Sequence, residues 1–206
     1  MTRVAIIRHG PTRWNAEKRL QGFTDIPLSP EGREMVATWR LPDGLAERRW
    51  VSSPLSRALE TARLMGAPEG IMLEPRLREI NYGAWEGRTY ADIEAEIGEA
   101  RLLDMQATGL AYAAPGGESR GDLHVRLADW LADVAAVGEP VLAFAHQGVI
   151  RGLVAMALGW DYVGELPRPY AELRIRAVAH EFEVAPGGAI AIRQLNLPLG
   201  ENARSD

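Results

Sequence analysis

The sequence predicts an α/β fold, a three-layer α/β/α sandwich with a mainly parallel central sheet. Short segments of strand character alternate with longer segments of helical periodicity, an order that builds a parallel sheet with helices on both faces. Residues 141–145 are continuously apolar, as expected of a strand that is buried on both faces. The length of 206 residues, without an internal repeat or linker-like tract, predicts one domain over 1–197 followed by a loose tail over 198–206.

Six segments have the composition of strands. They are residues 3–7, 50–52, 71–73 and 141–145, followed by alternating segments around 173–178 and 190–195. The earlier segments are short and apolar, whereas the last two alternate in polarity and are expected to close the sheet.

Capping residues and helical spacing mark the helices between these strands. Predicted helix starts are Ser29–Pro30, Ser53–Pro54 and a capping box at Thr89–Asp92, where a Ser or Thr cap precedes a Pro or an acidic residue. The first of these helices is expected to run to about residue 40 and the second to about residue 66. Two further helices are expected over 118–137 and directly after the strand at 141–145, because apolar residues there recur with a helical period.

Composition limits the partners and the compartment. A formal charge of −5 argues against nucleic acid or an anionic membrane as the main partner. The chain contains no cysteine, which excludes disulfides and thiolate chemistry, and no apolar run has the length of a signal peptide or a membrane span. We therefore expect a cytoplasmic protein; the sequence leaves a homo-oligomer open.

Two of the four histidines directly follow apolar strands. His9 comes after the strand at 3–7, and His146 comes after the strand at 141–145. In an open parallel sheet, ligands bind outside the carboxyl ends of the strands, so these two side chains are expected to lie at one edge. His124, on a predicted helix, and His180, on a late strand, are more simply explained as surface or packing residues.

Arginines accompany the two histidines at this edge. Arg8 precedes His9, Gly10 allows a tight turn beside a ligand, and Arg57 lies near the start of the helix after the second strand. Cationic side chains that converge repel one another unless an anion binds among them, and the fork of arginine fits a phosphoryl group. The site must be built from Arg and His, because every basic side chain except Lys18 is arginine.

Six stretches carry a resemblance to a known family in the family's order. They are Arg8-His9-Gly10-Pro11-Thr12-Arg13-Trp14-Asn15, residues 20–29 with Gln21-Gly22, residues 52–62 with Arg57, residues 77–87 with Glu79, Pro115-Gly116-Gly117-Glu118-Ser119, and residues 145–151 with His146-Gln147-Gly148. By these motifs the chain resembles the histidine phosphatase superfamily, which has the phosphoglycerate mutase-like fold. The resemblance covers about residues 9–151.

The resemblance implies a role for each matching residue. His9 is similar to the nucleophile that accepts the phosphoryl group, and Glu79 to the general acid. Further residues resemble the clamp and donors around the phosphoryl oxygens: they are Arg8, Arg57, His146, Asn15, Gln21, Gly22 and Gln147. Glu118 and Ser119 are expected near the pocket rim or, equally well, as helix-capping residues.

Other plans for phosphoryl transfer do not fit the residues present. A P-loop needs a lysine followed by Ser or Thr, but Lys18 is followed by Arg19, and a cysteine phosphatase lacks its nucleophile here. No close His/Asp cluster suggests a two-metal site, so we expect no metal, no cofactor and activity that survives a chelator.

Hydrolysis of a small phosphomonoester is therefore the expected function, and two alternatives remain. A cofactor-dependent phosphoglycerate mutase would use the same core, but the segment between Glu79 and His146 is shorter than in the mutases that the chain resembles. Gln21-Gly22 and His146-Gln147-Gly148 are similar to broad-specificity and α-ribazole phosphatases. A non-catalytic phosphate-binding protein is the other alternative.

Substrate specificity is expected to come from the rim of the pocket. Residues 83–120 are expected to cover it. Pro11 departs from the family, which commonly has Glu there, and proline offers neither a carboxylate nor a backbone N–H. Four aromatic residues could line an apolar mouth or serve only in packing: Trp14, Phe23, Trp85 and Tyr112.

Overall fold

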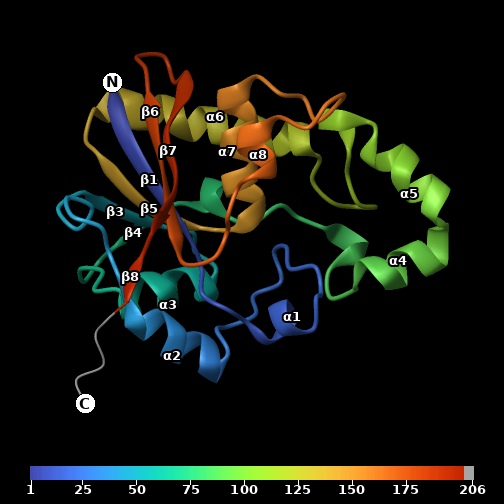
Figure 1. Ribbon diagram of the computed structural model, residues 1–206, viewed down its shortest axis with the longest axis horizontal. Coiled ribbons are helices and arrows are strands. Elements are labelled where there is room, and N and C mark those ends of the chain that lie inside the picture. Colours follow the sequence, from blue (N-terminus) through green and yellow to red (C-terminus); the bar gives the residue numbers. More distant parts are fainter. Residues whose placement is uncertain (202–206) are drawn as a thin grey trace.

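Six strands form one mixed sheet in the computed structural model, which describes residues 1–201 (Figure 1). Their order across the sheet is β4-β3-β5-β1-β6-β7. The strands are β1 (Thr2–Arg8), β3 (Arg49–Ser52), β4 (Met72–Leu73), β5 (Val141–Ala145), β6 (Val178–Val184) and β7 (Ile190–Pro198). Strands β4, β3, β5 and β1 are parallel, β6 is antiparallel to β1, and β7 is antiparallel to β6. The sheet is therefore mainly parallel, as predicted.

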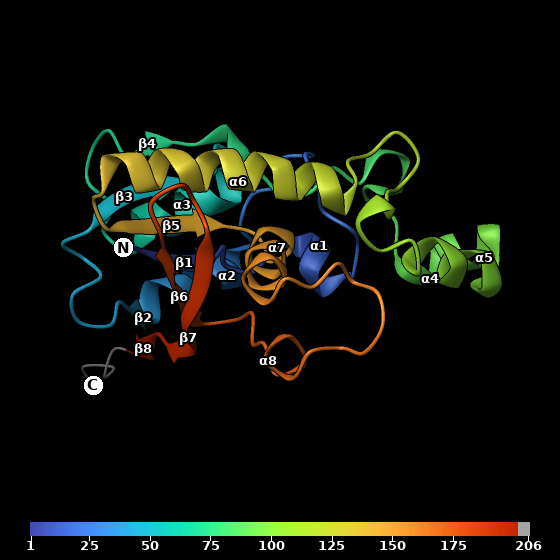
Figure 2. The same ribbon diagram turned by 90° about the horizontal axis from the view of Figure 1, so that it is seen from above.

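Helices cover both faces of this sheet (Figures 1 and 2). The helices are α1 (Arg13–Ala16), α2 (Pro30–Thr38), α3 (Ser56–Leu64), α4 (Tyr90–Ile97), α5 (Glu99–Gln106), α6 (Arg120–Val137), α7 (Gln147–Leu158) and α8 (Arg168–Ala171). Short 3-10 helices are η1 (Pro75–Leu77), η2 (Gly83–Trp85) and η3 (Gly109–Ala111). Helices α6 and α7 pack on one face, whereas α2 and α3 pack on the other. The predicted three-layer sandwich is confirmed.

Strand β5 illustrates why the central segments are continuously apolar. Its alternate residues point to opposite faces, as in any strand. Ala143 packs in the cluster that contains residues of α6 and α7, whereas Leu142 and Phe144 pack in the cluster that contains residues of α2 and α3. All five residues of β5 are buried, which accounts for the continuous apolar run.

The register of the parallel strands brings their carboxyl ends to one edge. Arg8 of β1 is paired with Ala145 of β5, and the backbone N–H of His9 continues the ladder to the Ala145 carbonyl oxygen at 3.0 Å. On the other side of β5, the N–H of Ser53 donates to the carbonyl of Phe144 at 2.9 Å. The segments that follow β1, β3 and β5 therefore lie side by side.

Residues 83–120 project from the sheet and carry their own small core (Figure 1, green). Helices α4 and α5 pack together here, separated at Gly98, whose φ of +84° favours glycine. The core consists of Trp85, Ile93, Leu102, Tyr112 and Ala114. The capping boxes at Thr89–Asp92 and Ser119–Asp122 begin α4 and α6.

Three predicted boundaries were wrong. Residues 173–177 are not a strand: β6 starts at Val178, because Ala177 has a φ of +53°, which no strand accommodates. The helix after β3 begins at Ser56 rather than at Ser53. Residues 198–201 are not a loose tail, since Gly200–Glu201 (β8) pairs with Trp39–Arg40 (β2), and Leu199 is buried. Residues 202–206 of the predicted tail lie outside the described residues.

Candidate active site

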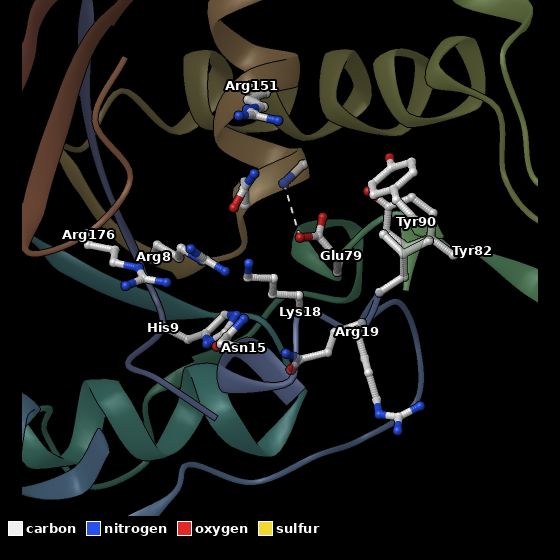
Figure 3. Close-up of a pocket in the computed structure, with 14 residues that line it drawn as sticks. Arg8, His9, Asn15, Lys18, Arg19, Glu79, Tyr82, Tyr90, Arg151 and Arg176 are labelled. Atoms are coloured by element: carbon white, nitrogen blue, oxygen red, sulfur yellow. Dashed lines mark hydrogen bonds between the residues drawn. The ribbon is translucent and has the colours of Figure 1, made fainter. Parts of the chain in front are cut away.

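A pocket of about 260 Å³ opens at the carboxyl edge of the parallel strands (Figure 3). Its lining combines predicted site residues with a ring of cations and two tyrosines. The lining residues are Arg8, His9, Asn15, Lys18, Arg19, Leu20, Gln21, Glu79, Tyr82, Tyr90, Gln147, Gly148, Arg151 and Arg176. Six of the nine predicted site residues are therefore on its wall.

His9 is held in one orientation by its own turn. Its Nδ1 lies 2.6 Å from the Gly10 carbonyl oxygen, which accepts the ring proton and leaves the lone pair on Nε2. Burial, together with repulsion from Arg8 and Arg57, lowers the pKa of His9 well below 6.5, so the imidazole is neutral. A side chain at Gly10 would place a Cβ 2.3 Å from Val36, which explains the need for glycine. Neutral imidazole with a free nitrogen is a nucleophile.

Arg8 presents its guanidinium to the same pocket. Burial and repulsion from Arg176, Arg151 and Arg57 lower its pKa to about 10, and this effect outweighs the attraction of Glu79. Arg8 therefore still carries its charge at neutral pH. Its buried Nε has no hydrogen-bond partner among the described residues. A charged guanidinium with a buried, unused donor is stabilised when an anion binds beside it.

Arg57 and His146 lie directly behind His9 rather than on the pocket wall. Both are fully buried, and the rings of His9 and His146 are 5.2 Å apart between centroids. The Nε of Arg57 donates to Nδ1 of His146 at 3.3 Å, which leaves the His146 proton on Nε2, 2.8 Å from the Ser53 hydroxyl. Burial and repulsion from Arg57, then from His9, lower the pKa of His146 well below 6.5. His146 is therefore a neutral hydrogen-bonding group.

The loop at 22–24 holds the guanidinium of Arg57. Its Nη2 donates to the Gly22 carbonyl at 2.8 Å, and its Nη1 to the Thr24 carbonyl at 3.0 Å. Glu86 holds this loop in turn, since its carboxylate accepts the N–H groups of Phe23 and Thr24, each at 2.7 Å. Gly22 serves through its backbone, and a Cβ there would lie 2.0 Å from Glu86.

Glu79 reaches the pocket from the opposite side to His9 and is tied to the start of α7. Its Oε2 accepts the backbone N–H of Gly148 at 3.0 Å (Figure 3). Its Oε1 accepts the backbone N–H of Ile80 at 2.9 Å. A Cβ at Gly148 would lie 2.3 Å from Oε1. The start of α7 therefore holds this carboxyl group at the pocket wall, where Glu79 as a whole is only 6 % exposed.

The three predicted amide side chains all line the pocket. Gln21 is buried, and neither its Oε1 nor its Nε2 has a partner within the described residues, so the amide is available to a ligand. The Oδ1 of Asn15 is already used, because it accepts from the N–H of Thr12 at 3.0 Å in the capping box of α1. Asn15 therefore offers only its amide N–H groups. Gln147 is the first residue of α7.

Several other predicted rim residues serve the structure instead. Ser119 caps α6, and Glu118 accepts from Arg126 at 2.6 Å and 2.9 Å. Trp85 and Tyr112 are buried in the core of the projecting segment. Trp14 and Phe23 do not line the pocket either. Phe23 lies under the guanidinium of Arg78, whose Cζ is 4.5 Å from the centroid of the Phe23 ring.

Sequence reasoning missed the two tyrosines and the outer cations of the pocket. Tyr90 comes from the projecting segment and Tyr82 from the loop after Glu79. Arg151 stands within a matching motif, so its position one turn after Gln147 on a helix was a usable signal. Arg176 lies within the segment that was wrongly predicted as a strand, and only the fold brings it to the pocket.

A second pocket of about 350 Å³ adjoins the first across His9 and Arg8. Pro11 lines it together with Met35 and Trp39. The carbonyl oxygen of Pro11 accepts the N–H of Ser29 at 3.0 Å, which keeps this turn against α2. The proline at this position therefore gives the second pocket an apolar wall where a glutamate would give it a charge.

A buried histidine with a free ring nitrogen, surrounded by arginines at the edge of a parallel sheet, defines a phosphoryl-transfer type of site. The chain belongs to the Histidine phosphatase superfamily (branch 1), whose family model matches residues 4–180. This finding confirms the resemblance seen in the motifs.

Individual relatives include phosphatases and mutases. The chain is 37% identical over 183 residues to a glucosyl-3-phosphoglycerate phosphatase of Mycolicibacterium vanbaalenii, covering 79% of each chain. It is 34% identical over 189 residues to a probable phosphoglycerate mutase of an Enterobacter species, covering 85% of this chain and 80% of the relative. The solved structure of a mycobacterial glucosyl-3-phosphoglycerate phosphatase with VO3 matches at a TM-score of 0.74, with 30% identity, over 96% of this chain and 100% of that one.

The described residues offer neither a metal-binding cluster nor a membrane-spanning helix. Among residues 1–201, no three His, Asp or Glu side chains are grouped so that they could hold a metal ion. None of the helices in this part of the chain is both long and apolar enough to span a bilayer.

Proposed function

We propose that the protein is a metal-independent phosphatase that hydrolyses a small phosphomonoester through a phosphohistidine at His9. The observation that carries the proposal is the neutral His9 imidazole, oriented by Gly10 with Nε2 unprotonated, beside the charged Arg8 in a polar pocket. The 37% identity to a glucosyl-3-phosphoglycerate phosphatase supports hydrolysis as the outcome.

In the first step, Nε2 of His9 attacks phosphorus in line with the ester oxygen. The N–P bond forms as the P–O bond to the alcohol breaks, and the departing oxygen takes a proton from Glu79. In the second step, Glu79 removes a proton from water, whose oxygen attacks phosphorus and breaks the N–P bond. Orthophosphate leaves and His9 is restored, so both steps balance with water as the one co-reactant.

Arg8 and Arg57 supply the positive charge for the phosphoryl oxygens. Arg8 faces the pocket directly, whereas Arg57 stands behind His9 and contributes its field and its contact with His146. Preplaced cations in a buried site stabilise charge that develops in the transition state. With the guanidinium of Arg8 in the pocket and the charge of Arg57 behind His9, a metal ion is not needed for this role. Gln21, Asn15 and Gln147 add neutral donors.

Phosphoglycerate mutase activity is the alternative that the relatives raise, because the chain is 34% identical to a probable phosphoglycerate mutase. Both activities use the same first step and differ in the acceptor of the phosphoryl group. The projecting segment 83–120 contributes Tyr90 to the pocket. We propose that this segment acts as a partial cover that leaves the pocket open to water, which favours hydrolysis.

The decisive experiment traps the intermediate. Brief incubation with a ³²P-labelled phosphomonoester is expected to label the protein with an acid-labile, base-stable phosphate, and His9→Ala is expected to lose both the label and turnover. Label or near-normal turnover in His9→Ala would contradict the mechanism. Isomerisation of 3-phosphoglycerate with a trace of 2,3-bisphosphoglycerate, with little free phosphate, would assign the protein to the mutases instead.

A further inference from the structure

The pocket holds more positive charge than one phosphoryl group requires. Its lining includes the cations of Arg8, Lys18, Arg151 and Arg176 against a single carboxylate, that of Glu79, while Arg19 is paired with Glu17 at 2.6 Å. Arg57 adds a further charge from behind His9. A phosphoryl dianion balances Arg8 and Arg57, and the charge of Lys18, Arg151 and Arg176 then exceeds that of Glu79.

These three outer cations are not neutralised by the protein itself. None of the ion pairs within the described part of the chain includes Lys18, Arg151 or Arg176. Arg151 and Arg176 are close enough to Arg8 that their repulsion lowers its pKa. The arrangement is therefore unfavourable in the empty pocket and is relieved when anionic groups bind.

The three side chains reach the pocket from separate parts of the fold. Lys18 follows α1, Arg151 lies on α7, and Arg176 lies between α8 and β6. Figure 3 shows these side chains around the pocket, whereas Arg19 points away from it. All three residues are exposed, but they come from three separate segments of the chain and line the same pocket.

The backbone holds two of these residues in place. Lys18 has a φ of +56°, at a helix end where glycine is the usual residue, and the N–H of Arg19 beside it donates to Trp14 at 2.9 Å. Next to Arg176, Ala177 has a φ of +53° and accepts the N–H of Leu199 at 3.0 Å. Non-glycine residues rarely adopt this conformation, so both turns are fixed by their surroundings.

Asn196 anchors the segment that carries Arg176. Its Oδ1 accepts the N–H of Arg174 at 2.7 Å, and its Nδ2 donates to the carbonyl of Glu172 at 3.1 Å. Asn196 belongs to β7, so the segment at 172–177 is fastened to the sheet. Arg176 is thereby positioned at the pocket although its side chain is exposed.

We propose that Lys18, Arg151 and Arg176 form a subsite for a second anionic group of the substrate, a carboxylate or a second phosphate. The inference rests on the proposed phosphatase function and narrows its substrate class to phosphomonoesters that carry another acidic group. The phosphoryl group to be transferred lies at His9 and Arg8, and the second anion lies among the outer cations.

Two substrates with the same carbon skeleton test the subsite. 3-Phosphoglycerate and glycerol 3-phosphate differ in one carboxylate, so the ratio of their kcat/KM values isolates its contribution. We expect a ratio of about ten or more, since a tenfold change corresponds to one charge-assisted contact at a partly exposed site. The ratio of kcat/KM for propane-1,3-diol bisphosphate to that for the monophosphate measures the contribution of a second phosphate in the same way. A preference for 3-phosphoglycerate or for the bisphosphate supports the subsite.

Charge-removing variants locate the preference. Lys18→Gln, Arg151→Gln and Arg176→Gln are each expected to lower the ratio several-fold while changing kcat/KM for glycerol 3-phosphate little. Arg63→Gln removes an exposed arginine of α3 that does not line the pocket, so it controls for net charge. Variants that lower both kcat/KM values equally, or a wild-type ratio near one for both pairs, overturn the subsite.

Lys18→Gly separates this role from a structural one. Glycine is favoured at a φ of +56°, so the variant is expected to unfold at the same temperature as the wild type or higher, yet to lose the preference. Lower stability with an unchanged ratio contradicts the proposal.

Binding provides a readout that does not depend on turnover. Calorimetric Kd values of 3-phosphoglycerate and glycerol 3-phosphate, measured on His9→Ala, should differ as the kcat/KM values do. If no phosphomonoester is turned over by the wild type but this difference in Kd is present, the phosphatase function fails and the subsite stands. If the Kd values are equal and turnover is normal, the phosphatase function stands and the subsite is excluded.

Discussion

The carboxylate of Glu79 accepts a hydrogen bond from the backbone N–H of Gly148, with 3.0 Å between Oε2 and N. Gly148 is the second residue of α7, which starts directly after His146, so the proposed general acid and the second histidine are positioned by the same turn. Glycine is required there, because a Cβ would lie 2.3 Å from Oε1 of Glu79.

Gly148→Ala is therefore expected to lower kcat by about 10²-fold, since a displacement of about 1 Å in a catalytic group has that effect. Gly121→Ala is the matched control, because Gly121 is also the second residue of its helix, α6, and lies away from the pocket. We expect it to keep normal activity. Steady-state kinetics and circular dichroism on both variants check this; equal activity in the two would contradict the assignment of Glu79.

Glu79→Gln is expected to affect substrates according to their leaving groups. Loss of a general acid costs about 10²–10⁴-fold when the leaving group is an alkoxide, which needs the proton. p-Nitrophenolate leaves without protonation, so formation of the phosphoenzyme from p-nitrophenyl phosphate should change much less. Rapid-quench measurement of phosphoenzyme formation compares an alkyl phosphate with p-nitrophenyl phosphate. An equal loss for both would show that Glu79 acts in another way.

Glu86→Gln is expected to lower kcat by about tenfold or more, although Glu86 does not line the pocket. The substitution brings an amide N–H group against the N–H donors of Phe23 or Thr24 and loosens the carbonyls that hold Arg57. Glu94→Gln, on the exposed surface of α4, is the control for charge and should have normal kcat. Unchanged kinetics in Glu86→Gln would exclude this support of Arg57.

Lowering the pH is expected to destabilise the fold already at pH values well above those at which carboxylates titrate. The pKa values of His9 and His146 are well below 6.5 when folded because of burial, whereas the unfolded chain has ordinary histidines. Between the folded and unfolded values the unfolded state binds more protons, so stability falls as pH falls below about 6.5. Each of these buried histidines lowers the free energy of unfolding by at most about 2 kcal/mol at pH 5, relative to neutral pH.

Burial also lowers the pKa of His180 to about 4, which adds to this loss of stability. Urea unfolding at pH values from 7.5 down to 5.5 measures the loss. A free energy of unfolding that stays level or rises over this interval would contradict neutral buried histidines. The same neutrality means that His9 does not lose its nucleophilic form over this interval, so kcat should not follow a titration near pH 6.5.

Chelation is expected to leave activity unchanged. The charge on the phosphoryl oxygens is met by Arg8 and Arg57, and the protein offers no grouped His, Asp or Glu ligands within residues 1–201. Dialysis against EDTA followed by assay in metal-free buffer measures this. Loss of turnover that returns with added Mg²⁺ or Zn²⁺ would require a revised mechanism.

Local patterns in the sequence predicted the parallel strands of the sheet and the two histidines at their ends, whereas Glu79 and the amide side chains were predicted from the family resemblance. Apolar runs and capping residues locate β1, β5 and α6, and strand ends locate His9 and His146. The segment 173–177 was predicted wrongly because its alternating polarity is real, while the positive φ at Ala177 arises from tertiary contacts.

The outer residues of the pocket could not be predicted from the sequence for a similar reason. Arg176 and Tyr90 carry no local mark of function, and only the packing of distant segments brings them to the same cavity. The buried positions of Arg57 and His146 behind His9 depend on how the 22–24 loop folds over them, which periodicity does not encode.

The pairing of Arg8 with Ala145 has a consequence for how the enzyme acquires activity. Strands β1 and β5, which His9 and His146 directly follow, are neighbours in the sheet but lie far apart in the sequence. Closing so long a loop makes their association slow compared with local helix formation. We therefore expect refolding experiments to recover helical content before activity, since His9 and His146 come together only when these two distant strands have paired.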